Sequence, residues 1–161
     1  MAKLKYGVVG SSQEPLVPFS VGAFYASQVF PKKSGRFATY DDSLNYWKSA
    51  ESGEAKLGGY VEQDLTTSAT NGGSKLPVFD IRGRTFELPY ATATAITTQL
   101  TQAVLDDLIG KTCDLLVTAN VQYADAGATT DNIFRIVGGD VTQGYGTLHV
   151  QVLDSVIGYI A

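Results

Sequence analysis

The sequence predicts a mainly β protein: an antiparallel β-sandwich or jelly-roll-like domain with one or two short helices and an extended N-terminal arm. Apolar and polar residues alternate in the last third of the chain, as at residues 147–152. Alternation of this kind places one apolar row on a core and one polar row on solvent or a neighbouring chain. Prolines interrupt the first 35 residues, which excludes a long helix or a central strand there.

The N-terminal part is predicted to be an arm. Residues 1–35 hold Pro15, Pro18 and Pro31 between short apolar runs, so we expect an extended segment with one or two short strands. Residues 36–161 are expected to form a single β-sandwich domain, because a chain of 161 residues suits one core.

The middle of the chain predicts a short helix and a loop. Asp41, Asp42 and Ser43 suit a helix N-terminus, and a helix that begins there would be closed by Tyr46 and Trp47. Residues 66–75 are rich in Gly, Ser and Thr and lack an apolar period, which is typical of a loop.

A hairpin and a second helix are predicted next. The apolar runs 78–82 and 85–88 flank Gly83, which favours a tight hairpin. Apolar residues then fall four apart from Ile96 to Leu108, and Gly110 stands where a helix C-cap favours glycine. These spacings predict one helix of about three turns.

Three strands are predicted after this helix. The first covers residues 114–121, the second begins at Ile133 and continues into Gly138-Gly139-Asp140, and the third covers residues 147–152. Residues 122–132 are expected to form a polar loop, and residues 143–146 a turn.

Composition excludes several classes of partner. The formal net charge is -4 and only 17% of residues are charged, so we predict no binding to nucleic acid or anionic lipid. Cys113 is the only cysteine, which excludes an intramolecular disulfide and a thiolate metal cluster. The N-terminal residues show neither a signal peptide nor a membrane span, and we expect folding in a cytosol.

The sequence shows no catalytic motif. Gly110-Lys111-Thr112 resembles the end of a phosphate-binding loop, but Leu105 stands where that loop needs a glycine. The carboxylates of Asp106, Asp107 and Asp114 lack the spacing of a calcium loop. His149 is the sole histidine, so we predict no metal site, no cofactor and no enzymatic activity. Catalysis by scattered carboxylates, as in glycosidases, stays an alternative.

Aromatic side chains are the candidate binding residues. The chain has nine tyrosines and seven phenylalanines, and several stand in the proline-interrupted arm, which has little local structure to bury them. Interfaces favour aromatic anchors. The predicted capsid-facing or subunit-facing residues are Tyr6, Phe19, Phe24, Tyr25, Phe30, Phe37, Tyr46 and Trp47.

Four segments carry a resemblance to a known family: residues 110–115 (GKTCDL), 119–125 (ANVQYAD), 134–140 (FRIVGGD) and 148–152 (LHVQV). They resemble the C-terminal part of tailed-bacteriophage capsid decoration, or cement, proteins. The stretch from Phe30-Pro31 through residues 34–40 faintly resembles the arm and extended-loop region of phage major capsid proteins. Those proteins are much longer than this chain, which argues against that identity.

The first resemblance implies a structural virion protein on the capsid exterior. It implies a homotrimer that binds the phage major capsid protein and cements neighbouring capsomers against internal DNA pressure. Residues from about Tyr6 to Phe37 would form the capsid-facing anchor. Two alternatives stay open: a carbohydrate- or receptor-binding β-sandwich of a fibre or head appendage, and a small hydrolase.

Overall fold

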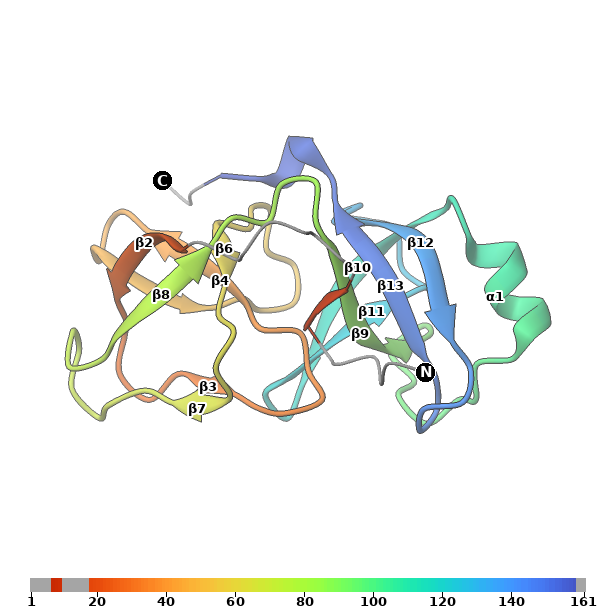
Figure 1. The fold of residues 1–161 in the computed structure, drawn as a ribbon, viewed down its shortest axis with the longest axis horizontal. Coiled ribbons are helices and arrows are strands. Elements are labelled where there is room, and N and C mark those ends of the chain that lie inside the picture. The colour runs from red at the N-terminus through yellow and green to blue at the C-terminus, as the bar shows by residue number, and fades with distance from the viewer. Residues whose placement is uncertain (1–6, 10–17, 159–161) are drawn as a thin grey trace.

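Two curled β-sheets lie side by side along the long axis of the protein. The computed structural model describes the backbone of residues 7–9 and 18–158, and the side chains from residue 21 onward. Figure 1 shows the first sheet at one end and the second, with helix α1, at the other. The strands are β1 (Gly7–Val9), β2 (Pro18–Ala23), β3 (Val29–Phe30), β4 (Phe37–Asp41), β5 (Tyr46–Ser49), β6 (Gly59–Tyr60), β7 (Leu65–Thr66), β8 (Lys75–Phe79), β9 (Thr85–Ala91), β10 (Thr112–Thr118), β11 (Val121–Asp125), β12 (Phe134–Asp140) and β13 (Thr147–Val152).

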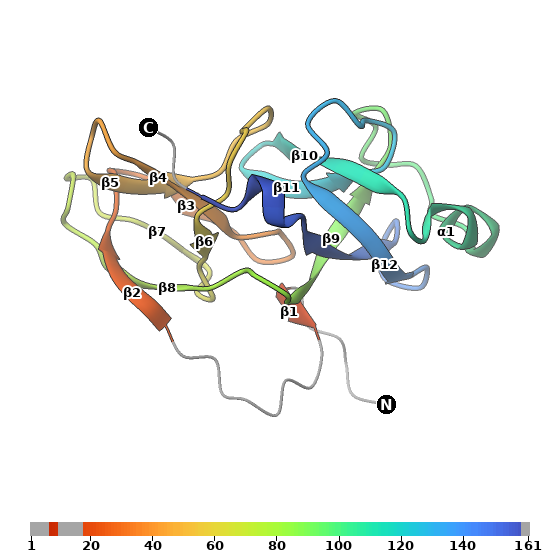
Figure 2. The same cartoon turned by 90° about the horizontal axis from the view of Figure 1, so that it is seen from above.

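The first sheet has the strand order β2-β8-β6-β4-β5, and it closes on itself. A parallel bridge joins Phe24 to Trp47, and the Tyr25 N–H donates to the Trp47 carbonyl at 2.8 Å. The short pair β3–β7 lies beside it, as the view from above in Figure 2 shows. The enclosed side chains are Phe24, Phe30, Ala38, Trp47, Val61, Leu76 and Val78.

The second sheet has the strand order β1-β9-β11-β10-β12-β13, and it closes because β13 also pairs with β9. Its strands pair antiparallel except for β11 with β9. The core inside it takes Phe86, Leu88, Phe134, Ile136, Leu148 and Val150 from the sheet. Phe37 and Tyr60 of the first sheet join this core, so the two sheets share a continuous apolar interface.

The predicted fold class is confirmed: the protein is mainly β, with antiparallel sheets and one short α-helix. The strand predicted from the alternation at residues 147–152 is confirmed, since Leu148, Val150 and Val152 are buried in β13. Apolar side chains on one face of a strand meet the core, and the intervening polar side chains face outward. After β13 the chain turns through a short 3-10 helix, Asp154–Val156, and returns to the first sheet at Leu57.

The predicted helix at residues 41–47 is wrong, because this segment is the hairpin that joins β4 to β5. The Asp41 carboxylate accepts hydrogen bonds from the Ser43 N–H at 3.0 Å and the Ser43 hydroxyl at 2.6 Å. Asn45 adopts a left-handed φ of 57°. Aspartate that satisfies its own neighbouring backbone suits a turn as well as a helix N-terminus, and here the turn is formed.

The predicted hairpin around Gly83 is also wrong, although the turn exists. Gly83 has φ of 67°, which glycine adopts without strain. The strands on either side of it, β8 and β9, belong to different sheets. The chain therefore crosses from the first sheet to the second at this turn, which a local sequence pattern does not distinguish from a hairpin.

The strand predicted at residues 114–121 is divided by a two-residue turn. Ala119 and Asn120 have φ of 51° and 65°, the pattern of the tight turn that connects twisted antiparallel strands. Strand β10 precedes this turn and β11 follows it. Residues 121–125 are consequently a strand, and the polar loop expected from residue 122 begins only after Asp125.

The helix predicted before Gly110 forms, but it is shorter than its apolar spacing suggests. Helix α1 (Gln102–Leu108) begins after Thr101, whose hydroxyl accepts from the Val104 N–H at 3.3 Å. Ile96 lies before the helix. Gly110 follows the helix and donates its N–H to the Ile136 carbonyl at 2.8 Å, so residues 110–112 connect a helix to a strand.

The predicted arm contributes to both sheets, through β1 in the second sheet and from residue 18 onward in the first. Strand β2 pairs with β8 over residues 18–23, and Phe24 and Phe30 are buried in the first core. Residues 1–6 and 10–17 of that arm lie outside the described residues. Phe24 and Phe30 are therefore buried within the protein itself, by strands that are distant from them in the sequence.

Candidate functional site

Four of the eight predicted interface aromatics are buried inside the protein. The exposed fractions are 0% for Phe24 and Phe37, 1% for Phe30 and 4% for Trp47. The structure therefore corrects their assignment as surface anchors, because buried rings cannot meet a partner in this fold. The proline-interrupted arm has little local structure to bury its aromatic side chains, but strands distant in sequence cover them. Tyr6 and the Phe19 side chain lie outside the described part.

Two of the eight, Tyr25 and Tyr46, remain at the surface. Tyr25 is 37% exposed, Tyr46 is half-buried, and their rings meet edge to face with centroids 6.0 Å apart. Two apolar side chains that the sequence reasoning missed extend this end of the protein: Val21 on β2 is 65% exposed and Leu44 in the β4–β5 turn is 45% exposed. We call Val21, Tyr25, Leu44 and Tyr46 the β2 end patch.

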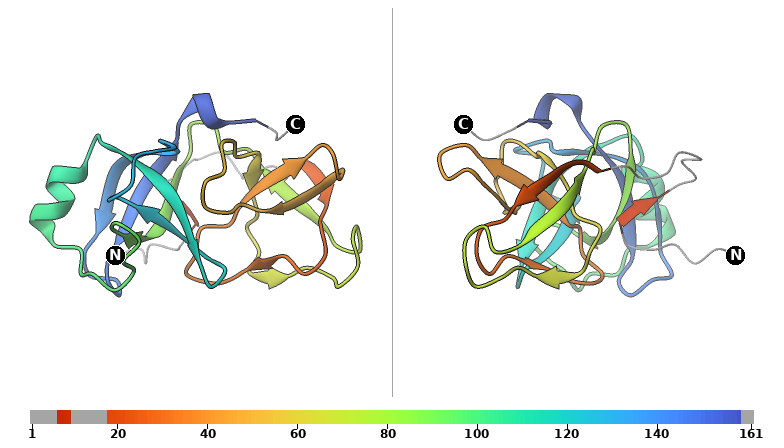
Figure 3. Two further views of the ribbon diagram at one scale, coloured as in Figure 1. Left: turned by 180° about the vertical axis from the view of Figure 1, so that it is seen from behind. Right: turned by 60° about the vertical axis from the view of Figure 1, so that its left-hand side comes forward.

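A second exposed apolar group lies at the opposite end. Val104 of α1, Ile109 just after it and Val137 of β12 are 40%, 50% and 39% exposed. Helix α1 and β12 lie at the far end of the long axis from β2, as Figure 1 and the rear view in Figure 3 both show. We call these three residues the α1 end patch. Val104 lies on the four-apart apolar spacing that predicted the helix, whereas the buried helical residue is Leu105.

A pocket of about 380 Å³ opens beside the β2 end patch, where β2 separates from the β4–β5 hairpin. We call it the seam pocket. Gly22 lies against the indole of Trp47, because a Cβ at Gly22 would stand 2.1 Å from Trp47 Cδ1. The lining residues are Val21, Gly22, Ala23, Tyr40, Asp42, Asn45 and Trp47.

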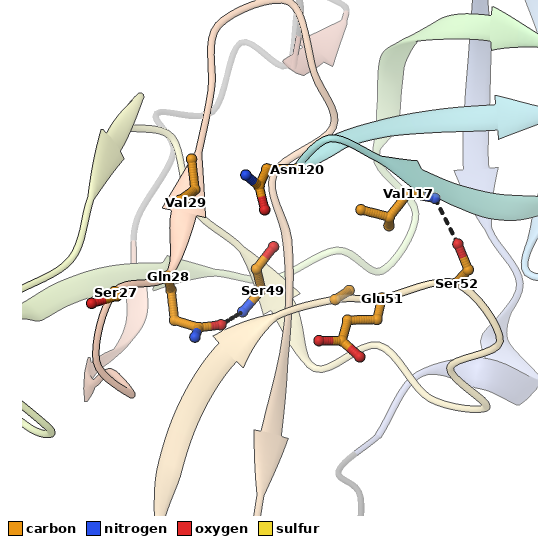
Figure 4. A pocket seen from close by; sticks show the side chains of 9 residues that line it. Ser27, Gln28, Val29, Ser49, Glu51, Ser52, Val117 and Asn120 are labelled. Carbon is orange, nitrogen blue, oxygen red and sulfur yellow. Dashed lines mark hydrogen bonds between the residues drawn. The ribbon is translucent and has the colours of Figure 1, made fainter. Parts of the chain in front are cut away.

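A second pocket, of about 410 Å³, lies between the two sheets and is polar (Figure 4). Two hydrogen bonds order its walls: the Ser49 N–H donates to Gln28 Oε1 at 2.9 Å, and the Val117 N–H donates to Ser52 Oγ at 2.7 Å. Glu51 and Asn120 complete its polar rim. Among the described residues that line it, none is aromatic.

The sole histidine, His149, faces Glu87 across β9 and β13. His149 Nε2 lies 4.0 Å from Glu87 Oε1, and that oxygen accepts from the Thr147 hydroxyl at 2.7 Å. The Glu87 carboxylate is fully buried. A carboxylate without solvent contact cannot itself touch a substrate in this conformation.

The carboxylates singled out in the sequence have structural partners. Asp114 accepts from the N–H groups of Thr130, Asp131 and Asn132 and so fixes the loop before β12. Asp107 pairs with Lys111 at 2.8 Å on the surface of α1. Side chains 21–158 contain no group of three His, Cys, Asp or Glu residues placed to hold a metal ion.

Gln122 is one of the buried polar residues that nothing in the sequence pattern singled out. It is 1% exposed, and its side chain reaches from β11 of the second sheet to β4 and β5 of the first. Its Oε1 accepts from the Phe37 N–H at 2.8 Å, and its Nε2 donates to the carbonyls of Phe37 and Ala50 at 3.0 and 3.1 Å. The polar pattern after residue 121 predicted a loop, so nothing in the sequence marked this glutamine as internal.

Burial sets the protonation of Cys113. The thiol has no solvent exposure, and desolvation raises the pKa of Cys113 far above its ordinary value, with further contributions from the carboxylates of Asp114 and Asp125. A thiol held neutral is a poor nucleophile. Cys113 is therefore a small buried group of the second core.

The comparisons with known proteins add no assignment. No protein-family model, no curated protein and no solved structure matches the chain. Within residues 7–9 and 18–158, no helix has the length and apolar character needed to cross a membrane.

Proposed function

We propose that the chain is a structural virion protein that binds the outer surface of a phage capsid and cements neighbouring capsomers against internal DNA pressure. The observation that carries the proposal is the presence of exposed apolar side chains at both ends of an elongated protein. A bridge between two subunits needs a contact surface at each end and a rigid body between them. The β2 end patch and the α1 end patch meet the first requirement, and the two packed sheets meet the second.

The sequence resemblance supports the same proposal. The four segments similar to decoration proteins run from Gly110, just before β10, to β13, and the strands they cover belong to one sheet. The partner would be the phage major capsid protein, the oligomer a homotrimer and the location the capsid exterior. In a trimer each contact is repeated, so modest affinities combine through avidity.

Binding to expanded heads tests the proposal. The wild-type chain should co-sediment with purified expanded heads built from the major capsid protein of the same phage. Deleting residues 1–35 is a poor variant, because it removes β2 and two core phenylalanines. Better variants replace exposed side chains: V21D/L44D at the β2 end patch and I109D/V137D at the α1 end patch should each bind fewer copies.

A control variant carries the same added charge elsewhere. Gln63 and Thr129 are exposed outside both patches, so Q63D/T129D should co-sediment like the wild type. A wild-type chain that stays in the supernatant would reject the capsid proposal, and equal binding by all four proteins would reject the two patches as contact surfaces. Native mass spectrometry of the wild type tests the trimer.

The carbohydrate-binding alternative has weaker support from the described residues. Sugar recognition uses exposed aromatic faces, whereas Trp47 is 4% exposed and stacks on Phe24 with a centroid distance of 6.4 Å. Tyr40 meets the same indole edge to face at 5.4 Å. A glycan array on the wild-type chain tests this alternative, and binding to any saccharide class would support it.

A further inference from the structure

Strand β2 is an edge strand where it lines the seam pocket. It pairs with β8 on one side only, and the pairing matches Val21 with Pro77, which has no N–H to donate. On its other side the closing bridge is confined to Phe24 with Trp47. The segment before Phe24 therefore has no neighbouring strand among the described residues on the side of the β4–β5 hairpin.

The direction of the main chain shows which groups are available. The Phe24 N–H donates to the Ser74 carbonyl, and the Phe24 carbonyl accepts from the Gly72 N–H, so both groups of Phe24 face the β8 side. Main-chain groups alternate in direction along a strand. Val21 consequently points its N–H and carbonyl into the seam, and Ala23 points its N–H the same way. A row of unpaired main-chain groups is a template for another strand.

The walls of the seam pocket define what such a strand would carry. Tyr40 and Trp47 form an apolar floor, and the exposed side chain of Val21 forms one lip. Asp42 is an exposed carboxylate at the hairpin end of the pocket, and no ion pair joins it to another described residue. The volume of about 380 Å³ suits a short extended segment rather than a folded element.

We propose that the seam pocket binds an extended peptide segment, added as a strand along β2, with an apolar side chain over Tyr40 and Trp47 and a Lys or Arg beside Asp42. Strand addition combines main-chain hydrogen bonds for affinity with side-chain pockets for specificity. The identity of the donor rests on the proposed function, because an extended segment of the major capsid protein is the peptide that a cement protein would meet. The peptide site itself stands on the geometry of β2.

Selection from a random library of twelve-residue peptides, displayed by mRNA display against the full wild-type chain, tests the site directly. We expect an enriched family with an apolar residue and a nearby Lys or Arg. V21P removes the N–H that faces the seam and no hydrogen bond to β8, and proline is tolerated on edge strands. It should weaken binding of the enriched peptide about tenfold or more, the loss expected for a main-chain hydrogen bond and its geometry.

Matched variants separate the main-chain effect from the side-chain effect. V21A keeps the N–H and should bind within about twofold of the wild type, since it removes only a few methyl groups at an exposed site. D42K should weaken binding, whereas D64K reverses an exposed charge outside the pocket and should not. Equal affinity of V21P and V21A, or no enriched peptide family, would overturn the proposal.

A measurement on the unmodified chain covers the case in which V21P misfolds. In NMR spectra the amide signals of Val21 and Ala23 should shift and exchange more slowly with solvent when the peptide is bound; unchanged amides would overturn strand addition. Saccharide binding that D42K weakens and V21P leaves intact would also overturn it, because a sugar does not need the Val21 N–H. If the peptide binds as predicted but the wild type does not co-sediment with expanded heads, the peptide site is supported and the capsid function is rejected.

Discussion

Replacing Gln122 by alanine should destabilise the protein by about 4 kcal/mol. The change leaves the Phe37 N–H and the Ala50 carbonyl without their partner in a buried site, and each unpaired buried group costs about 1–3 kcal/mol. The Phe37 carbonyl loses less, because it still accepts from the Ala50 N–H at 2.9 Å. The lost side-chain volume adds a cavity between the sheets.

The glutamate variant distinguishes hydrogen bonding from volume. Q122E has the same shape, but its carboxylate would face the carbonyl oxygens of Phe37 and Ala50 in a buried site. Burial and those oxygens raise the pKa of the introduced carboxyl in the folded state above its unfolded value. The neutral acid is accepted at low pH, so Q122E should lose stability relative to the wild type as the pH rises from 4 to 7.

Urea unfolding followed by the fluorescence of Trp47 measures both variants. At constant slope, a lower midpoint reports a loss of stability. Gln151 supplies the control, since it is half-exposed and makes a single side-chain hydrogen bond to Thr85 at 3.1 Å, so Q151A should cost less than about 1 kcal/mol. A loss below about 1 kcal/mol for Q122A, or equal stability of Q122E at pH 4 and 7, would refute the role given to Gln122.

Three further predictions follow from local geometry. G22A should cost about 2–3 kcal/mol in urea unfolding, because its methyl group overlaps the buried indole of Trp47. The Ser43 hydroxyl lowers the pKa of Asp41, so an NMR titration should find it below its ordinary value, and S43A should raise it; the stability that this carboxylate contributes is lost as the pH falls through its folded-state pKa. Cys113 should react with a thiol reagent only on unfolding, because burial raises the pKa of its thiol.

Each of these has an outcome that contradicts it. G138A is the control for G22A, because a Cβ at Gly138 meets His149 only at 3.4 Å. Similar losses of unfolding free energy for both variants would show that the Trp47 indole shifts to accommodate the methyl group. An Asp41 pKa that S43A leaves unchanged would remove the hydroxyl as its cause. Rapid labelling of Cys113 in the native protein, at a rate independent of urea, would show that the second core opens without unfolding.

Local sequence patterns correctly predicted the elements that form whichever strand or sheet lies beside them. The alternation of residues 147–152 requires a strand whichever strand lies beside it, and β13 forms there. The apolar spacing before Gly110 requires a helix, and α1 forms, though it begins at Gln102 because Thr101 provides the cap. The class of the fold follows from such elements.

The errors arose where tertiary pairing decides between local alternatives. Asp41 accepts backbone hydrogen bonds in a turn or at a helix start, and the pairing of β4 with β5 selects the turn. Gly83 permits a hairpin or a crossover, and the separate partners of β8 and β9 select the crossover. Gln122 reads as a loop residue, since nothing local shows that another sheet brings the Phe37 backbone to its amide.

Burial by distant strands also explains why predicted aromatic anchors lie inside the protein, whereas the candidate contact residues lie at its two ends. Phe24, Phe30 and Trp47 fill the core of the first sheet, whereas the apolar side chains of Val21 and Leu44 are exposed at this end of the protein. If the two end patches hold neighbouring capsomers, tension along the long axis must cross from one sheet to the other. The links there include side-chain and main-chain hydrogen bonds of Gln122, the hydrogen bond from the Val117 N–H to Ser52, the bridge between Leu57 and Ile157, and aromatic contacts of Phe37 with Phe86 and Phe134. Gln122 is the link that joins three strands at once, so a bridging function would depend on this one buried amide more than on any aromatic anchor.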